Sequence, residues 1–276
     1  MEAEGCYPGS VGELLQGNFQ GRDILLSCPV NLYTRVKLFE SKSISNKYKN
    51  EKADKFLLNM LNRWECGMYY NTLDIEICSH IPKGKGFSSS TGDLCALYKA
   101  LLKLFNKKFN QQELLEECIL IEPTDSIIFG EMTLFDYKNG SFHKSMGSYF
   151  EFYVVVYEGN NIVDTIEFNK RALQPLANIE DLVPVLEEGI TEKDINKIGF
   201  AASESIVRNQ QRLKYGILGK VLDINKKTGG AGVLGAHSGD CLGIIFDDEE
   251  RAKYTKEHYL FQDSYRNYIV KSIKIF

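Results

Sequence analysis

Hydrophobic and polar positions alternate along residues 73–78 of the chain. Leu73, Ile75 and Ile77 share one face of an extended segment, and Asp74 and Glu76 lie on the other face with the cysteine that follows. This period of two residues predicts a half-buried β-strand. Runs rich in β-branched and aromatic residues predict further strands at 24–27, 30–39, 133–137, 152–157, 241–246 and 268–275.

A helical period follows at residues 91–105, where large apolar side chains form one stripe: Leu94, Leu97, Tyr98, Leu101, Leu104 and Phe105. A second helix is predicted at 111–121, and it ends before Pro123 because proline disfavours helical backbone in the preceding residue. Similar patterns predict helices at 53–64, 178–188, 192–211, 215–226 and 248–259. Strands and helices are mixed in both halves without regular alternation, which predicts an α+β protein with two lobes.

The composition is that of an ordinary globular protein. The 276 residues, 43% hydrophobic and 25% charged, suffice for one large domain or two closely packed ones. The formal net charge is −4, and Lys and Arg are scattered among acids, so we expect neither nucleic acid nor a membrane as partner. The locally basic stretch 42–55 is interpreted as a solvated loop or helix edge.

The ends and the cysteines suggest a compartment. Residues 1–5 hold two Glu and no basic residue, and no apolar run approaches the ~18–20 residues of a transmembrane helix. We therefore expect a cytoplasmic protein without a leader. Seven widely spaced cysteines without a CxxC pair predict reduced thiols rather than disulfides or a zinc site. The four histidines show no paired metal spacing.

The clearest chemical signal is the turn at residues 82–91, between a predicted strand and a predicted helix. A helix N-terminus offers an anion amide groups without intrahelical partners and a favourable dipole. Gly84 and Gly86 permit close backbone approach, and Lys83 and Lys85 add charge. Three successive serines add hydroxyls that cap the helix or ligate Mg²⁺. The turn predicts a phosphate site, although a glycine turn before a capped helix explains the same residues.

Two other nucleotide-binding patterns do not fit. The Walker pattern GxxxxGK[ST] is absent from the sequence. Residues 230–235 match GxGxxG, but a predicted helix precedes them and a strand follows, which reverses the dinucleotide-binding order. We interpret the glycine-rich segment 229–243 as a tight loop that lets another backbone or a ligand come close.

Three segments, PGSVGELLQG at 8–17, PKGKGFSSST at 82–91 and GGAGVLGAHSG at 229–239, resemble the galactokinase, homoserine kinase, mevalonate kinase and phosphomevalonate kinase (GHMP) superfamily. The strings PGSVGELLQG, LLSCPVNLY, GFSSSTGD, IEPTDS and AHSG, in this order, closely resemble the bacterial L-threonine kinases of the propanediol-utilisation type. The resemblance spans nearly the whole chain. It implies a mixed-sheet, ATP-binding N-terminal lobe at 1–148 and a ferredoxin-like C-terminal lobe at 149–276.

The resemblance also implies the reaction, in which ATP phosphorylates the hydroxyl of L-threonine to give L-threonine O-3-phosphate for adenosylcobalamin biosynthesis. Such a transfer needs a clamp on the phosphates, a metal ion and a group that accepts the hydroxyl proton. By analogy Ser90 and Glu122 bind Mg²⁺, and Asp125 is the base; capping of helix ends is the alternative for the two acids. The ATP phosphates are assigned to the whole turn, Lys83, Gly84, Lys85, Gly86, Phe87, Ser88, Ser89, Ser90 and Thr91.

The acceptor side follows from the same resemblance and takes residues from the N-terminal loop, the adjoining strand turn and the C-terminal loop: Glu13, Ser27, Cys28, Asn31, His237 and Ser238. A purely structural role is the alternative for His237. The expected partners are a small amino acid and ATP with Mg²⁺, in a monomer or homodimer. Two other functions stay open, a kinase of another small alcohol such as homoserine and a non-catalytic ligand sensor on the same fold.

Overall fold

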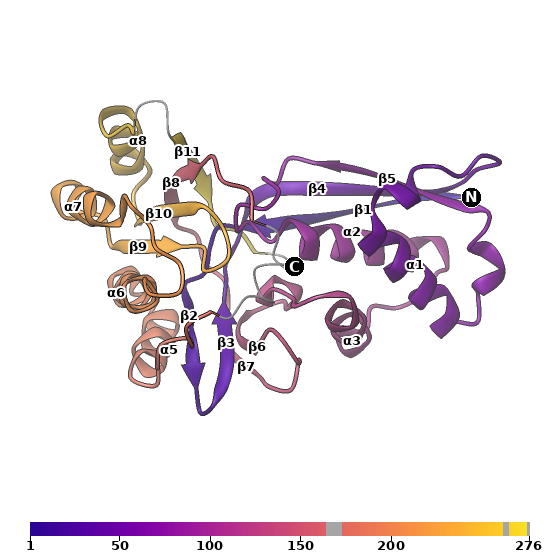
Figure 1. Cartoon of the computed structure of the whole chain (residues 1–276), viewed down its shortest axis with the longest axis horizontal. Coiled ribbons are helices and arrows are strands. Elements are labelled where there is room, and N and C mark those ends of the chain that lie inside the picture. Colours follow the sequence, from indigo (N-terminus) through magenta and orange to yellow (C-terminus); the bar gives the residue numbers. More distant parts are fainter. Residues whose placement is uncertain (164–172, 262–264, 275–276) are drawn as a thin grey trace.

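The computed structural model describes residues 1–163, 173–261 and 265–274. Three antiparallel sheets and the helices that cover them make up this part of the chain (Figure 1). The first sheet has the order β1-β4-β5, formed by β1 (Glu2–Ser10), β4 (Pro29–Glu40) and β5 (Leu73–Ser79). The helix α2 (Ser89–Leu104) packs along β1 and β4, and α1 (Glu51–Arg63) and α3 (Gln111–Ile121) pack beside it.

A second sheet lies between this layer and the C-terminal half of the chain. Its order is β2-β3-β6-β7, formed by β2 (Leu15–Phe19), β3 (Arg22–Leu26), β6 (Met132–Asp136) and β7 (His143–Gly147). The short 3-10 helix η3 (Ser126–Ile128) packs against β6 and connects this sheet to α3. Two other 3-10 turns, η1 (Lys47–Lys49) and η2 (Gly67–Tyr69), flank α1.

The third sheet has the order β11-β8-β10-β9, with β8 (Tyr153–Gly159), β9 (Gly232–Gly235), β10 (Cys241–Phe246) and β11 (Tyr265–Lys271). Its helices, seen at the left of Figure 1, are α5 (Leu182–Glu192), α6 (Ile195–Arg208), α7 (Leu218–Thr228) and α8 (Glu249–His258). Numbered within the lobe, the strands lie in the order 4-1-3-2 with helices in the first and last connections. This is the ferredoxin-like topology that the sequence analysis expected.

The predicted α+β class is confirmed, with one difference in detail. The N-terminal lobe was expected to contain a mixed sheet, but its named strands pair only antiparallel within the described residues. The boundary expected at 148/149 falls between β7 and β8. The C-terminal end of the described chain also meets the N-terminal half, since Ser272 forms a bridge with Val30 in β4.

Two predictions about polar positions need correction. The stretch 42–55 was interpreted as solvated, but Lys47 is buried, with its ammonium 3.6 Å from the centre of the Tyr70 ring. Asp74 was placed on the polar face of its strand, but it is buried too. Its carboxylate accepts backbone N–H groups from residues 45–47, and these hydrogen bonds offset the cost of burying the charge. All seven cysteines are free thiols, as predicted.

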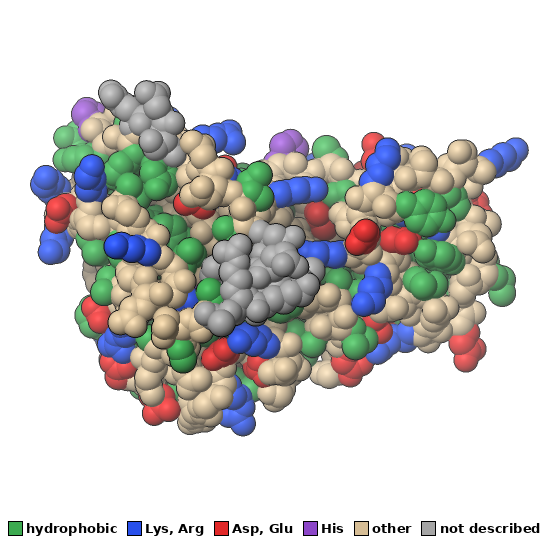
Figure 2. All heavy atoms as spheres, in the orientation of Figure 1, with side chains coloured by type: hydrophobic (Ala, Val, Ile, Leu, Met, Phe, Trp, Pro, Cys, Tyr) green, Lys and Arg blue, Asp and Glu red, His purple; other side chains and the backbone are tan. Residues whose placement is uncertain are grey.

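On the face shown in Figure 2, Lys and Arg side chains are interspersed with Asp and Glu rather than gathered into a patch. Within the described part of the chain, the structure holds no helix with the length and apolar character that crossing a bilayer requires.

Candidate active site

Three loops that are far apart in the sequence meet at one place in the fold. The backbone amide of Ser10 donates to the carbonyl of Phe87 at 3.0 Å, and that of Gly12 donates to Gly86 at 2.9 Å. From the C-terminal lobe, the amide of Asp240 donates to the carbonyl of Lys85 at 3.1 Å. The three segments that the sequence analysis singled out therefore pack directly against one another.

Glycine makes this close packing possible. Gly86 has φ +87°, and a Cβ added there would overlap the Cβ of Ala236. Gly12 has φ +53°, and its added Cβ would lie 2.6 Å from the carbonyl carbon of Gly235. Both the left-handed conformation and the lack of space require glycine at these positions. The prediction that the glycine-rich segment 229–243 lets another backbone come close is confirmed, but its interpretation as a loop is wrong in part, because residues 232–235 form β9 and β10 begins at Cys241.

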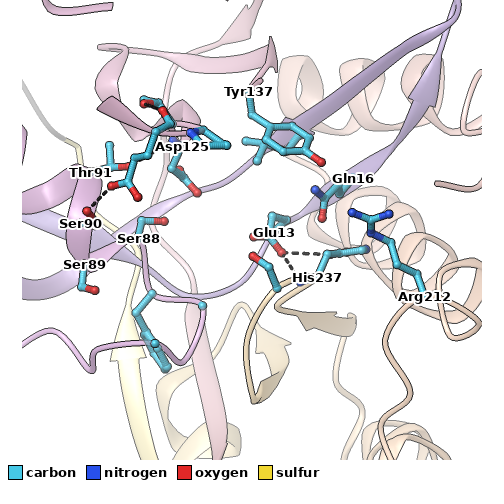
Figure 3. Close-up of a pocket in the computed structure, with 18 residues that line it drawn as sticks. Glu13, Gln16, Ser88, Ser89, Ser90, Thr91, Asp125, Tyr137, Arg212 and His237 are labelled. Carbon is cyan, nitrogen blue, oxygen red and sulfur yellow. Dashed lines mark hydrogen bonds and ion pairs between the residues drawn. The ribbon is translucent and has the colours of Figure 1, made fainter. Parts of the chain in front are cut away.

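The turn leads into the N-terminus of α2, which faces a pocket (Figure 3). Ser88 is the N-cap residue, but it has the left-handed φ of +54° and its side chain makes no capping hydrogen bond. Its hydroxyl lies 2.5 Å from that of Ser10 instead. The capping alternative therefore does not explain the Ser88 side chain, while the first-turn amides keep their general capacity to bind an anion.

Ser90 and Glu122 come together at the pocket wall. The Ser90 hydroxyl donates to Glu122 Oε1 (Figure 3), and Lys52 Nζ from α1 lies 2.6 Å from Glu122 Oε2. Glu122 is the C-cap residue of α3, yet its buried side chain reaches α2 rather than its own helix. A carboxylate and a hydroxyl are the hard oxygen donors that Mg²⁺ prefers. Among the described residues no group of three or more His, Cys, Asp or Glu side chains is arranged to hold a metal.

Asp125 is buried in the same pocket. Its Oδ1 accepts from the amide of Ile127 at 3.0 Å, which caps η3, and its Oδ2 accepts from the hydroxyl of Ser27 at 3.0 Å. Burial raises the pKa of Asp125 to about 6, and the charge of Glu13 adds to the rise, against hydrogen bonds from Ser88, Ile127 and Ser27 that lower it. Capping therefore accounts for one oxygen of Asp125, and the carboxyl group still borders the pocket.

Glu13 and His237 form a buried pair on the opposite wall. Oε2 of Glu13 accepts the backbone amide of His237 at 2.9 Å and lies 3.0 Å from its Nδ1. The other ring nitrogen of His237 lies 3.3 Å from the hydroxyl of Ser205 in α6. Ser205, His237 and Glu13 have the order of a hydrolytic Ser–His–acid triad. They do not act as one, because Ser205 is fully buried and its hydroxyl is hydrogen-bonded to the backbone of Gln16.

Several residues assigned from the sequence lie outside the pocket. Asn31 accepts the amide of Lys271 through its side chain, and Lys85 donates to the carbonyl of Gly159 at 2.7 Å. Burial raises the pKa of the Cys28 thiol, which is enclosed in the core. Phe87, in contrast, does line the pocket, and its ring is also stacked near that of Tyr268. Ser27 contributes through its hydrogen bond to Asp125. Lys83 is not among the residues lining the pocket, which include Gly84, Gly86, Ser88, Ser89, Ser90, Thr91 and Ser238.

Three polar residues that the sequence analysis did not assign also line the pocket: Gln16, Tyr137 and Arg212. Gln16 stands within the N-terminal motif, so its place in PGSVGELLQG was the available signal. Arg212 follows the end of α6, outside any motif, and Tyr137 follows β6. The local sequence carries no mark that would have distinguished these two from surface residues.

Sequence and structure comparisons agree on the family. The GHMP kinase N-terminal domain matches residues 52–130, and the GHMP kinase C-terminal domain matches residues 186–257. An L-threonine kinase of Citrobacter freundii is 27% identical over 246 residues, covering 87% of this chain and 85% of the relative. One of Salmonella typhimurium is 26% identical over the same length, covering 87% and 81%.

Solved structures share the whole fold. Homoserine kinase from Cytophaga hutchinsonii superposes with a TM-score of 0.74 at 16% identity, covering 99% of this chain and 95% of that one. Mevalonate kinase from Methanococcus jannaschii gives 0.71 at 17% identity, covering 99% and 98%. With both family domains matched in order, the chain belongs to the GHMP kinases and is an ATP-dependent kinase.

Proposed function

We propose that this kinase phosphorylates the side-chain hydroxyl of L-threonine, giving L-threonine O-3-phosphate. The observation that carries the proposal is the buried Asp125 carboxyl, which shares one pocket with the N-terminus of α2. Its support from sequence is the likeness to two L-threonine kinases over most of the chain. On the resemblance given above, the product would supply adenosylcobalamin biosynthesis in the cytoplasm.

The phosphates of ATP are assigned to residues 84–91. The amide groups of the first turn of α2 point toward its N-terminal end and carry the positive end of the helix dipole, which favours a polyanion. We further propose that the two lobes divide at 148/149. On that division the phosphate turn and both acids belong to the N-terminal lobe, and His237, Ser238 and Arg212 reach the pocket from the C-terminal lobe.

Ser90 and Glu122 are the residues that would hold Mg²⁺. Their oxygens already lie together at the pocket wall, and the charge of Glu122 is balanced by Lys52 in this arrangement. Bound there, the ion would neutralise charge on the phosphate oxygens.

Asp125 is the proposed proton acceptor. A carboxyl group with a pKa of about 6 is mostly ionised at neutral pH, yet it is basic enough to take a proton as the oxygen–phosphorus bond forms. The hydrogen bonds from Ser27 and Ile127 fix the orientation of the carboxylate. The proton of the threonine hydroxyl passes to Asp125, and the hydroxyl oxygen attacks the γ-phosphorus while ADP leaves.

Measurement of ADP release with a panel of acceptors tests the proposed function. L-Threonine, L-serine, L-homoserine and mevalonate should be compared at saturating ATP and Mg²⁺, and we expect L-threonine to give the highest kcat/KM. Turnover with homoserine alone would show the threonine assignment to be wrong. ATP binding without turnover on any alcohol would favour a non-catalytic sensor.

Asp125→Asn tests the base in the same assay. We expect kcat to fall by roughly 10²–10⁴-fold, the usual contribution of a positioned general base, with little change in the affinity for ATP. Asp136→Asn is the matched control, because Asp136 is also a buried aspartate but serves the turn after β6. If kcat is unchanged in Asp125→Asn, Asp125 is not the general base.

A further inference from the structure

The pocket has two chemically different ends (Figure 3). At one end lie the serines of the phosphate turn and Asp125. At the other end lie Gln16 and Arg212, with Glu13 and Tyr137 between the two ends. The first end serves the transfer of the phosphoryl group, so the second end faces the part of the acceptor that does not react.

Arg212 gives this second end a fixed positive charge. Its backbone amide donates to the carbonyl of Asn209 at 2.9 Å, which ties the residue to the C-terminus of α6. Its Nη1 donates to the carbonyl of Gln174 at 2.9 Å, which orients the guanidinium group. Among the described residues that line the pocket, Arg212 is the only lysine or arginine. A guanidinium group binds a carboxylate through two parallel hydrogen bonds.

Gln16 adds an acceptor that lacks a partner. Its side chain is 5% exposed, and no hydrogen bond within the described structure reaches its buried Oε1. The backbone of Gln16 is held on both sides, since its amide donates to the Ser205 hydroxyl at 2.9 Å and its carbonyl accepts from Asn209 Nδ2 at 3.0 Å. A rigidly held and buried acceptor without a partner is costly, which indicates that a ligand supplies the donor.

Glu13 places a negative charge beside that acceptor. The carboxylate is 6% exposed, and both of its hydrogen bonds to His237 fall on Oε2. None of the described residues donates a hydrogen bond to Oε1 of Glu13. An ammonium group that binds there therefore displaces no existing donor. One wall of this end therefore attracts a cation, and Arg212 attracts an anion.

We propose that Arg212 binds the α-carboxylate of an amino-acid acceptor and that Gln16 Oε1 and Glu13 bind its α-ammonium group. The inference rests on the proposed function in one respect, namely that the pocket receives the acceptor of a kinase reaction. The paired charges favour a zwitterion over an uncharged alcohol, because each charged group of the zwitterion would meet a pocket group of opposite charge. They also disfavour an acceptor with a carboxylate alone, which would face Glu13.

The contact between Arg212 and the α-carboxylate is tested by a thermodynamic cycle that combines one substitution in the enzyme with one change in the substrate. The acceptors are L-threonine and threoninol, the amino alcohol in which a hydroxymethyl group replaces the carboxylate. The enzymes are the wild type, Arg212→Gln and, as a charge control, Lys214→Ala at an exposed neighbouring position. We expect Arg212→Gln to raise KM for L-threonine about 10–100-fold, while KM for ATP changes less than about threefold.

We expect Arg212→Gln to have little effect on kcat/KM for threoninol, and the loss of the carboxylate to have little effect in Arg212→Gln. The wild type should prefer L-threonine over threoninol by about 10–100-fold in kcat/KM, and Arg212→Gln should show almost no preference. If the substitution and the substrate change lower kcat/KM independently, so that their fold-losses multiply, the carboxylate assignment is overturned. An effect of Lys214→Ala as large as that of Arg212→Gln would overturn it too. Glu13→Gln should raise KM for L-threonine and leave KM for ATP unchanged, and an unchanged KM for L-threonine would overturn the ammonium assignment.

Direct binding separates this inference from the proposed function. Calorimetry with a non-hydrolysable ATP analogue measures the binding of L-threonine and threoninol without turnover. Retained preference for L-threonine, lost in Arg212→Gln, supports the inference even where no acceptor is phosphorylated. Equal binding of the two compounds by a catalytically active wild type overturns the inference and leaves the kinase assignment intact. Thermal unfolding shows whether Arg212→Gln is folded, and Arg212→Lys, which keeps the charge, supplies a second variant if it is not.

Discussion

Asp125 combines burial with hydrogen bonds in a way that sets its titration range. Desolvation raises its pKa to about 6, and the group must be ionised to accept a proton. We therefore expect kcat/KM for L-threonine to be level above pH 7 and to fall about tenfold per pH unit below pH 6. ADP release measured from pH 5 to 8.5 at constant ionic strength checks this. ATP affinity over the same range is the control, and a rate independent of pH down to 5 would contradict the assignment.

The same pKa predicts how Asp125 affects stability. A carboxyl group whose folded-state pKa is raised stabilises the native state at low pH, and this contribution is lost as pH rises through the folded pKa. A rise from 3.8 to about 6 corresponds to a cost of about 3 kcal/mol above pH 6. We expect Asp125→Asn to have a higher free energy of unfolding than the wild type above pH 6, by up to that amount, and no advantage near pH 4. Urea unfolding at several pH values measures it.

Asp136 supplies a control of opposite sign. Burial raises its pKa, but hydrogen bonds from Ser141, Asn139 and Lys138 outweigh burial and lower the pKa below the ordinary value. Its charge therefore stabilises the native state above the unfolded pKa, and this contribution is lost as pH falls. Asp136→Asn should lower the free energy of unfolding at neutral pH. A gain in both variants, or a loss in both, would show that the substitutions act through packing rather than charge.

At the scale of elements, segments with a regular hydrophobic pattern were predictable, and strands whose pattern is interrupted were not. The helix at 111–121 and the strand at 241–246 have their predicted bounds, and the predicted helix at 91–105 begins at Ser89. The strands β1, β2 and β7 were missed, because glycine, proline or polar residues interrupt their alternation and their pairing depends on distant partners. β9 was taken as loop for the same reason, since two of its four residues are glycine.

The meeting of the three glycine-containing loops is an element-scale feature that can be tested. At Gly86 both the positive φ and the overlap with Ala236 oppose a side chain. We expect Gly86→Ala to lower the free energy of unfolding by more than about 3 kcal/mol and to abolish ATP binding, because the phosphate turn must move. Chemical unfolding and calorimetry with ATP measure the two effects.

Gly21 is the matched control for this substitution. It has a similar φ of +76° in the turn between β2 and β3, but an added Cβ would have no atom within 4 Å. Gly21→Ala should therefore cost only about 1 kcal/mol, from backbone strain alone, and should leave ATP binding unchanged. Equal losses in the two variants would show that φ, rather than the contact between loops, is what requires glycine at Gly86.

At the scale of the whole molecule, the pocket is assembled from both lobes, which limits what the sequence could reveal. Residues in contiguous motifs, such as Ser90, Glu122 and Asp125, could be singled out from the sequence, and the structure brings them to one pocket. Arg212 was not, because it enters the pocket only through the way α6 packs against β2 and β9. Asn31 was assigned from its position in a motif, although its strand turns that side chain toward β11. Contacts between lobes depend on tertiary packing, and a single sequence does not encode them as local patterns.

Asn209, the C-cap residue of α6, connects this helix to β2 of the N-terminal lobe. It is buried, its Nδ2 donates to the carbonyls of Gln16 and Ser205, and its Oδ1 accepts the amide of Ala177 at 3.0 Å. Asn209→Ala would leave the partner groups unpaired in the interior, at a cost of about 2–4 kcal/mol in the free energy of unfolding. Because Asn209 fixes the backbone of Gln16, we also expect KM for L-threonine to rise more than KM for ATP.

The exposed neighbour Gln211 provides the control for this prediction, since Gln211→Ala should change the free energy of unfolding by less than about 0.5 kcal/mol. Urea unfolding and steady-state kinetics of Asn209→Ala separate two roles. A loss of stability with both KM values unchanged would mean that Asn209 only joins the lobes. A selective rise in KM for L-threonine would mean that the contact between the lobes also sets the shape of the acceptor end. The second outcome is expected, because the hydrogen bond that Asn209 donates and the two that Gln16 forms with the Ser205 hydroxyl hold the same short segment of β2 that presents Gln16 to the pocket.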